Sequence, residues 1–123
     1  SESRVLLIED DMFMSGLLTQ SLERAGFESS VAKTGSEGVE MFHGTRFDLI
    51  VLDLMLPDED GLEVLRKIRR LPGGAEVKVL VLTNRAQEAR SEEAKRLGVA
   101  EYLIKANFSL DEIIGKIKTA LRV

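Results

Sequence analysis

The chain contains no cysteine, so it can form neither a disulfide framework nor a metal site built on thiolates. It also lacks any apolar stretch close to the ~20 residues that a membrane-spanning helix needs. The net charge of −4 argues against direct nucleic-acid binding, because phosphate contacts need a basic patch. The first residues, Ser1-Glu2-Ser3, lack the charged and apolar regions of a signal peptide. We therefore expect a cytoplasmic protein that does not associate with membranes.

The length and composition predict one domain that covers residues 1–123. A chain of this size buries about two-thirds of the surface that it exposes when unfolded. Apolar runs alternate with segments that carry helix start and stop signals. The runs predict strands at Val5–Ile8, Ser29–Ala32, Leu49–Asp53, Val77–Leu82 and Tyr102–Ile104. This alternation favours a flavodoxin-like, doubly wound α/β fold with a five-stranded parallel sheet in the order 2-1-3-4-5 and helices on both faces.

Helix boundaries are predicted from caps and glycines. Asp11 is a candidate N-cap of the first helix, and Gly26 a candidate stop. The pairs Thr34–Glu37, Asp60–Glu63 and Ser109–Glu112 have the spacing of capping boxes, and Gly44 and Gly98 lie where the second and fourth helices should stop. The fourth helix, Arg85–Leu97, is mostly polar, so we expect it to bury little and to dock weakly.

Asp53 is the most informative residue, because it places a carboxylate at the tip of an apolar strand. The run Leu49–Leu52 is typical of a strand that is buried on both faces of a parallel sheet. A carboxylate there is desolvated at a cost unless another group compensates it. Open α/β sheets bind ligands beyond the carboxyl ends of their strands, which makes Asp53 a candidate functional residue. Taken alone, it is also compatible with a turn cap.

Three other predicted strands end on polar groups. Glu9 and Asp10 follow the first strand, Thr83 follows the fourth, and Lys105 follows the fifth. Because the ends of parallel strands meet at one edge, a single crevice would hold three carboxylates, a hydroxyl and an ammonium group. A solvated lysine is the ordinary alternative for Lys105 alone, but coincidence across four strands favours a common site.

The chemistry of such a cluster is constrained by its charge. Two carboxylates about 4 Å apart repel by ~4 kcal/mol at an effective dielectric of about 20, so three need protons or a bridging cation. Oxygen ligands without His or Cys favour Mg²⁺ over zinc. A magnesium ion, a lysine and a hydroxyl around a free carboxylate are the parts that stabilise a transferring phosphoryl group. The pattern therefore predicts a phosphoryl acceptor site in which the carboxylate is the nucleophile.

Other polar and sulfur-containing residues have structural interpretations. The single histidine, His43, lies near a predicted helix end, where a surface or capping role is favoured over catalysis or metal binding. The acidic run of residues 58–60 predicts a solvated turn that leads into the third helix. The methionines expected to fill the core are Met12, Met14 and Met41.

Taken together, these residues resemble the receiver domain of bacterial two-component response regulators over essentially the whole chain. The segments that carry the resemblance are Val5-Leu6-Leu7-Ile8-Glu9-Asp10-Asp11, Asp48-Leu49-Ile50-Val51-Leu52-Asp53-Leu54-Met55-Leu56-Pro57 with Gly61, Val81-Leu82-Thr83 and Tyr102-Leu103-Ile104-Lys105. The resemblance implies that Asp53 accepts a phosphoryl group from a sensor histidine kinase or a phosphotransfer protein. It also implies a switch that catalyses only its own phosphorylation and dephosphorylation, and that acts as a monomer or a phosphorylation-dependent dimer.

The same resemblance assigns the remaining site residues. Glu9, Asp10 and Asp53 would bind Mg²⁺, together with the backbone carbonyl of Met55. Thr83 and Lys105 would contact the phosphoryl group, and Tyr102 would be the switch aromatic. The fourth helix, fifth strand and fifth helix would form the surface that controls an effector domain or partner protein.

Two residues depart from the family pattern. Ala106 replaces the proline that usually follows the lysine, and a cis bond before Ala costs ~2.5–4 kcal/mol. Asn84 replaces a small residue after the threonine. These departures bear on the lifetime of the phosphoryl group more than on the identity of the acceptor.

Alternative functions follow from the same residues. Asn84 and Ala106 leave open a phosphorylation-independent interaction module on the same fold. An aspartate-nucleophile phosphatase would usually carry a second acid two residues after the nucleophile, where this chain has Met55. A flavin-binding flavodoxin is disfavoured, because the acidic first loop would repel the cofactor phosphate.

Overall fold

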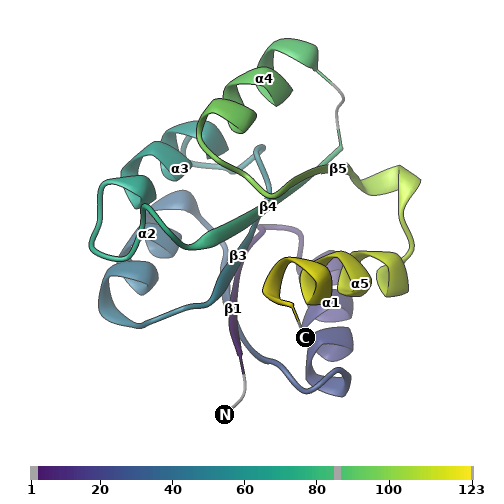
Figure 1. Cartoon of the computed structure of the whole chain (residues 1–123). Coiled ribbons are helices and arrows are strands. Elements are labelled where there is room, and N and C mark those ends of the chain that lie inside the picture. The colour runs from purple at the N-terminus through teal and green to yellow at the C-terminus, as the bar shows by residue number, and fades with distance from the viewer. Residues whose placement is uncertain (1–2, 85–86, 123) are drawn as a thin grey trace.

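The computed structural model describes residues 3–84 and 87–122. Its strands are β1 (Arg4–Ile8), β2 (Glu28–Ala32), β3 (Leu49–Leu52), β4 (Lys78–Thr83) and β5 (Glu101–Ile104). Its helices are α1 (Met12–Arg24), α2 (Gly35–Gly44), α3 (Gly61–Arg69), α4 (Glu88–Arg96) and α5 (Leu110–Leu121), with a 3₁₀ turn at Lys105–Asn107 (Figure 1). None of the helices described has the length and apolar content to cross a membrane.

The strands form one parallel sheet in the order β2-β1-β3-β4-β5, which confirms the predicted fold class. β3 lies at the centre of the sheet and pairs with β1 and β4. The carboxyl ends of β1 and β4 therefore lie on either side of the carboxyl end of β3. Asp53 follows the last residue of β3 rather than belonging to it. Thr83 is the last residue of β4, whereas Val77 precedes that strand.

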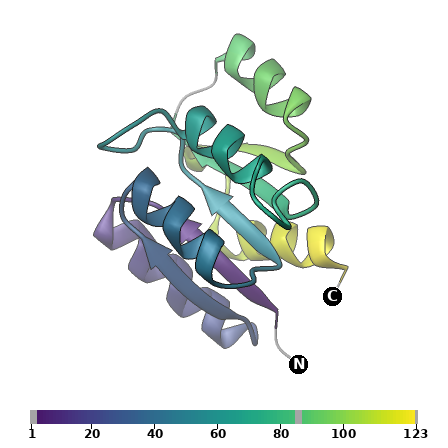
Figure 2. The same ribbon diagram turned by 90° about the vertical axis from the view of Figure 1, so that its left-hand side faces the viewer.

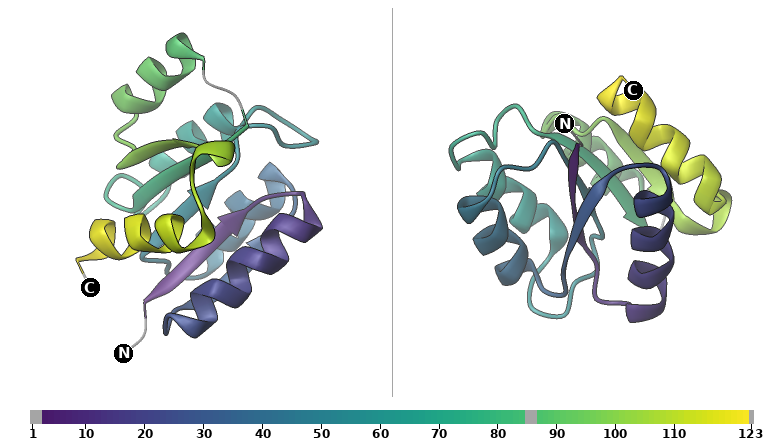
Figure 3. Two further views of the ribbon diagram at one scale, coloured as in Figure 1. Left: turned by 90° about the vertical axis from the view of Figure 1, so that its right-hand side faces the viewer. Right: turned by 90° about the horizontal axis from the view of Figure 1, so that it is seen from below.

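Side chains alternate between the two faces of the sheet, and each face is covered by helices. Leu6, Ile50 and Val79 point to the face that α2 and α3 cover, which lies in front in Figure 2. Leu7 and Val51 point to the opposite face, where α1 and α5 lie together (Figure 3). This period of two, with both faces buried, explains why the strands are continuous apolar runs.

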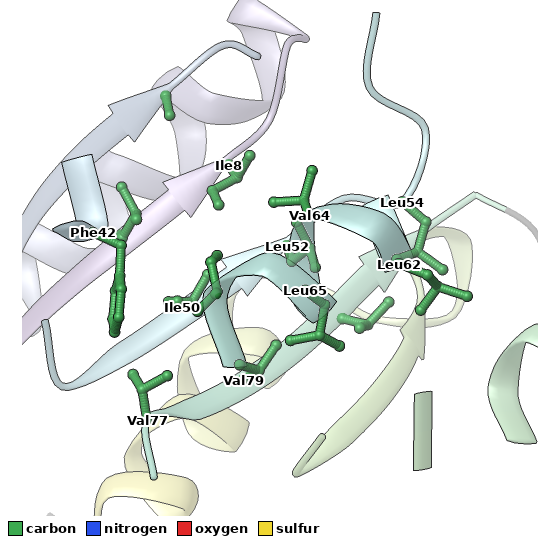
Figure 4. Packing of buried hydrophobic residues seen from close by; sticks show 14 of the residues in the cluster. Ile8, Phe42, Ile50, Leu52, Leu54, Leu62, Val64, Leu65, Val77 and Val79 are labelled. Atoms are coloured by element: carbon green, nitrogen blue, oxygen red, sulfur yellow. The ribbon is translucent and has the colours of Figure 1, made fainter. Parts of the chain in front are cut away.

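The α3 face shows how this packing is achieved. Figure 4 shows the α3 side chains Leu62, Val64 and Leu65 beside Ile50 and Leu52 of β3. All five are almost completely shielded from solvent. Burial of each such side chain contributes about 1.5–3 kcal/mol before entropy is counted, so α3 is firmly docked on the centre of the sheet.

Several predicted caps are confirmed. Asp11 accepts from the backbone N–H groups of Phe13 (3.0 Å) and Met14 (3.2 Å), and Gly26 follows α1 with φ of +92°. Ser109 and Glu112 form a complete capping box at α5. At α2, the Thr34 hydroxyl accepts from the backbone N–H of Glu37, while the Glu37 carboxylate accepts from the backbone N–H of Lys33. Gly98 follows α4 with φ of +78°.

Gly44 is the last residue of α2, so this helix ends where the sequence predicts. Two other local predictions are wrong. Glu63 forms an ion pair with Arg66 one turn on instead of completing a capping box with Asp60. Met12 does not fill the core: its side chain is 70% exposed, because it lies outside the stripe of α1 that buries Ser15, Leu18 and Leu22.

α4 is attached to the domain mainly by polar contacts. Among its described side chains only Ala94 is buried, as its polar sequence predicts, and residues 85 and 86 of the predicted helix lie outside the described residues. Glu93 forms an ion pair with Arg66 of α3. The guanidinium of Arg69, at the end of α3, donates to the carbonyls of Leu97 and Gly98 just after α4. It also donates to the carbonyls of Gly74 and Val77 in the loop before β4.

Candidate functional site

The central strands bring two acids to the carboxyl edge of the sheet. The N–H of Asp53 donates to the carbonyl of Ile8 (3.0 Å), which continues the pairing of β3 with β1 by one residue. The N–H of Glu9 donates likewise to Ala32 of β2 (2.9 Å). Backbone pairing on the central strands thus fixes Glu9 and Asp53, and both side chains are buried, with 2% and 5% exposed.

Asp10 completes a cluster of three carboxylates. One oxygen from each of Glu9, Asp10 and Asp53 lies within 4.8 Å of the others, and only Asp10 is exposed to solvent. Hard oxygen donors at this separation match the ligand preference of a small divalent cation, with water able to enter from the Asp10 side. The donor set therefore fits Mg²⁺.

Lys105 supplies the positive charge of the site. Its Nζ lies 2.6 Å from Oε1 of Glu9 and 3.2 Å from Oδ2 of Asp53. Burial alone would lower the pKa of Lys105, but the hydrogen bond that it donates to Glu9 and the charges of both acids outweigh that effect and raise the pKa. The lysine is therefore a permanent cation in the site.

Glu9 is held in a medium that disfavours its charge. Burial raises the pKa of Glu9 from 4.5 to about 6, against the opposing effects of the Lys105 hydrogen bond and of the N–H of Asp11, which donates to Oε2 (3.1 Å). The charge of Asp53 adds to the increase. The raised pKa means that the negative charge of Glu9 is disfavoured in this site. A bound cation would offset that cost.

Residues 54–60, which we call the acceptor loop, start from Asp53 and lead to α3. The N–H of Met55 donates to Oδ1 of Asp53 (3.1 Å), while the Met55 side chain is 51% exposed. At the other end of the loop, the N–H of Gly61 donates to the carbonyl of Leu54 (2.9 Å). A Cβ on Gly61 would lie 2.5 Å from Cα of Leu54 and 2.7 Å from the carbonyl oxygen of Asp53, so only glycine allows this closure.

Thr83 and Tyr102 occupy the neighbouring strands β4 and β5. Thr83 is buried at the end of β4, in register with Ile104, the residue before Lys105. Tyr102 is in register with Val81, and its half-buried ring packs against the core on the α3 side of the sheet. Burial raises the pKa of the Tyr102 phenol, and the charge of Arg90 on α4 opposes this increase.

The two departures from the family pattern are both exposed. Asn84 follows β4, and Ala106 lies in the 3₁₀ turn after β5. The described residues contain no cis peptide bond, so the bond between Lys105 and Ala106 is trans. The loop is thus shaped differently from one with a cis proline.

The sequence predicts a capping contact for Asp60 but no specific contact for Asp58. Asp58 is exposed, yet its carboxylate accepts from the N–H groups of Gly35 (2.8 Å) and Ser36 (3.0 Å) at the start of α2. These bonds lower the pKa of Asp58. Asp60 caps α3 through Leu62 (2.9 Å) and also binds Arg90 of α4. The acids lie in an exposed turn that leads into α3, as predicted, but the contacts of Asp58 with α2 and of Asp60 with Arg90 were not predicted.

A hollow lies at the opposite edge of the sheet, where the loops before β3 and β4 meet, and His43, Arg46, Phe47 and Glu76 line part of it. His43 is exposed at the end of α2, which agrees with a surface position. Glu9, Asp53 and Lys105 do not line this hollow.

The fold and the site together define a doubly wound α/β protein with an acidic, lysine-containing cation site at the carboxyl edge of its sheet. The chain belongs to the response regulator receiver domain family, whose model matches residues 5–118. This confirms the resemblance found in the sequence.

Individual relatives agree with that assignment. The chain is 32% identical over 122 residues to the transcriptional regulatory protein ResD of Bacillus subtilis and 34% identical over 122 residues to TrcR of Mycobacterium tuberculosis. These alignments cover 99% of this chain but 49% and 46% of the relatives, so the chain spans about half their length.

Solved structures extend the comparison to the fold. A CheY-like response regulator receiver domain protein from Methanospirillum hungatei superposes with a TM-score of 0.92 at 30% identity, over 99% of this chain and 95% of that one. The receiver domain of the sensor histidine kinase PA1611 from Pseudomonas aeruginosa, which was solved with a magnesium ion coordinated in its active site cleft, gives 0.88 at 25% identity over the full length of both chains.

Proposed function

We propose that the chain is a phosphorylation-activated switch of two-component signalling that accepts a phosphoryl group on Asp53. One observation carries the proposal: the buried Asp53 carboxylate contacts the Lys105 ammonium group and lies within 4.8 Å of two further carboxylates, Glu9 and Asp10. The phosphodonor would be a phosphohistidine on a sensor histidine kinase or a phosphotransfer protein. The chain would then catalyse its own phosphorylation and dephosphorylation, without an external substrate.

The residues of the site would share the work of holding the acceptor ready. The N–H of Met55 and the ammonium group of Lys105 bind different oxygens of Asp53, which fixes the rotation of the carboxylate. Glu9, Asp10, Asp53 and the backbone carbonyl of Met55 would hold Mg²⁺. When bound, the ion supplies positive charge that neutralises the phosphoryl oxygens.

The transfer is a displacement at phosphorus. An oxygen of Asp53 forms the new P–O bond as the P–N bond to the donor imidazole breaks, and the imidazole leaves with that electron pair. Lys105 would pair with a phosphoryl oxygen and so stabilise charge that increases during the transfer. Thr83 would donate its hydroxyl hydrogen to another phosphoryl oxygen, and Tyr102 would move with it.

The surfaces for partners follow from the same geometry. Three exposed apolar side chains, Met12, Phe13 and Met55, lie on segments next to the acceptor and suit contact with the phosphodonor. The α4–β5–α5 surface would control an effector domain, which fits relatives that are twice as long and that are named transcriptional regulators. The cytoplasmic location, the single-domain extent and the oligomeric state stay predictions.

Phosphate-affinity electrophoresis after treatment with acetyl phosphate tests the proposal. The protein should shift when Mg²⁺ is present and not when it is chelated. Asp53→Asn should abolish the shift, whereas Asp111→Asn, an exposed acid on α5, should leave it unchanged. A shift that persists in Asp53→Asn would overturn the assignment. No shift in the wild type, with no response to Mg²⁺ or beryllofluoride, would instead favour a phosphorylation-independent interaction module.

A further inference from the structure

The far end of the acceptor loop is joined to α4 by a bidentate ion pair. Arg90 donates from Nη1 to Oδ2 of Asp60 (3.0 Å) and from Nη2 to Oδ1 (2.5 Å), although 30 residues separate the two. Oδ1 of Asp60 also accepts from the N–H of Leu62 at the start of α3 (2.9 Å). One carboxylate therefore connects the acceptor loop, α3 and α4.

The acceptor loop connects Asp60 to the acceptor residue Asp53. Met55 and Asp60 pair with each other in an isolated antiparallel bridge, so the two ends of the loop lie side by side. The N–H of Met55 in turn holds Oδ1 of Asp53 (3.1 Å). Three consecutive contacts thus lead from the guanidinium of Arg90 to the acceptor carboxylate.

α4 has few other contacts that would hold its amino end. Its N-cap, Gln87, makes no side-chain capping bond, and Ala94 is the one buried side chain among those described in the helix. A second ion pair of α4, between Glu93 and Arg66 of α3, does not involve the acceptor loop. Among the described residues, the pair with Asp60 is the contact that joins α4 to the acceptor loop.

We propose that Arg90 is a positioning residue for the acceptor site: through Asp60 it holds the Met55 backbone beside Asp53. The position of α4 and the affinity of the site for its ligands are then coupled. The coupling is reciprocal, so a partner that moves α4 also changes how the site binds Mg²⁺ or a phosphoryl group. The inference rests on the proposed function of Asp53.

The exposure of the pair limits the size of the effect. The side chains of Arg90 and Asp60 are 30% and 43% exposed, so solvent screens their attraction. Ion pairs of this kind change an equilibrium by up to about fivefold. We therefore expect changes of about two- to fivefold, and not a complete loss of binding.

Three variants separate this role from general attachment of α4. Arg90→Gln removes the ion pair and leaves the Asp60 cap on Leu62 in place. Glu93→Gln removes the other ion pair between α3 and α4 and leaves the acceptor loop untouched. Arg90→Lys keeps the charge without the two-pronged geometry, so it should restore part of the effect.

The measurements are amide hydrogen exchange in residues 54–60 and 88–96, and an NMR titration with Mg²⁺ alone. Arg90→Gln should speed exchange in both segments and raise the Mg²⁺ concentration at half-saturation about two- to fivefold. Arg90→Lys should lie between it and the wild type, and Glu93→Gln should affect residues 88–96 only.

The inference is overturned if Arg90→Gln leaves the acceptor loop and the Mg²⁺ titration unchanged, or if Glu93→Gln changes them equally. Should Arg90→Gln fail to fold, Arg90→Lys decides by the same criteria. Neither measurement requires phosphoryl transfer. A lack of acetyl phosphate labelling on Asp53, combined with the expected loop effect, would therefore refute the proposed function alone.

Discussion

Lys105 is bound more closely to Glu9 than to the acceptor: its Nζ lies 2.6 Å from Oε1 of Glu9, against 3.2 Å from Oδ2 of Asp53. The lysine is thus first the counter-ion of a buried glutamate. Both side chains are shielded, with 10% of Lys105 and 2% of Glu9 exposed, so solvent cannot replace either partner. The stability of the fold and the chemistry of the site therefore depend on the same ion pair.

Lys105→Met tests that dependence. Removing one partner of a buried ion pair costs about 3 kcal/mol, because the other charge is left without compensation. The loss in free energy of unfolding should be large at pH 8 and smaller at pH 5, where Glu9, with its pKa of about 6, is mostly protonated. Urea unfolding in EDTA measures it. Lys116→Met, at an exposed pair 3.8 Å from Glu101, should cost under about 1 kcal/mol. Equal losses of Lys105→Met at both pH values would contradict the prediction.

Glu9 should make the Mg²⁺-free protein less stable as the pH rises. Its pKa is raised to about 6 in the fold from 4.5, so folding favours the protonated acid. That stability is complete below pH 4.5 and is lost as the pH passes about 6. Glu9→Gln has no carboxyl group to ionise at this position, so it does not lose this stability as the pH rises. The free energy of unfolding of Glu9→Gln minus that of the wild type should therefore rise across this range, by up to about 2 kcal/mol. A difference that is flat or falls with pH would refute the interpretation.

Magnesium should stabilise the fold through Asp10. A ligand that binds only the folded state adds about 1.4 kcal/mol for each tenfold increase in concentration above its Kd. The wild type should melt at a higher temperature as Mg²⁺ is added, and Asp10→Asn should respond much less. Asp11→Asn is the matched control, because it removes the adjacent charge while Asn can still cap α1. Equal responses in both variants would exclude Asp10 as a ligand.

Gly61→Ala should disturb the acceptor loop. The added Cβ would meet the backbone of Leu54 and Asp53 at 2.5 and 2.7 Å, which no side-chain rotation relieves. We expect a loss of about 2 kcal/mol or more in the free energy of unfolding, and slower labelling by acetyl phosphate. Gly115→Ala on α5 meets nothing within 4 Å and should be neutral or stabilising. Unchanged stability and labelling in Gly61→Ala would show that the loop can relax.

The fold was predictable because its signals are local. A short apolar run such as Leu49–Leu52 is enough to predict a buried strand. Asp11 caps α1 through the N–H groups of residues only two and three positions away. The convergence of Glu9, Asp53 and Lys105 was also predictable, since parallel strands share an edge. What these predictions have in common is that one element, or one rule of topology, determines them.

The contacts of the acceptor loop were not predictable in this way. Asp58 binds the start of α2 and Asp60 binds Arg90 across 30 residues, and no periodicity relates an acid in a turn to a distant helix. Met12 shows the same limit on the apolar side. It lies two residues before the half-buried Met14 and so on another side of α1, outside the stripe of Leu18 and Leu22, which its apolar character alone did not reveal.

Arg69 has a mechanical consequence for α4. Its guanidinium binds the carbonyls of Leu97 and Gly98 just after the helix, together with those of Gly74 and Val77 below it. Four such bonds anchor the carboxyl end of α4, whereas Arg90 near the amino end binds Asp60 in a partly exposed ion pair. The helix should therefore move as a lever with its fulcrum at Gly98. The largest displacement then falls at the end that faces the acceptor loop.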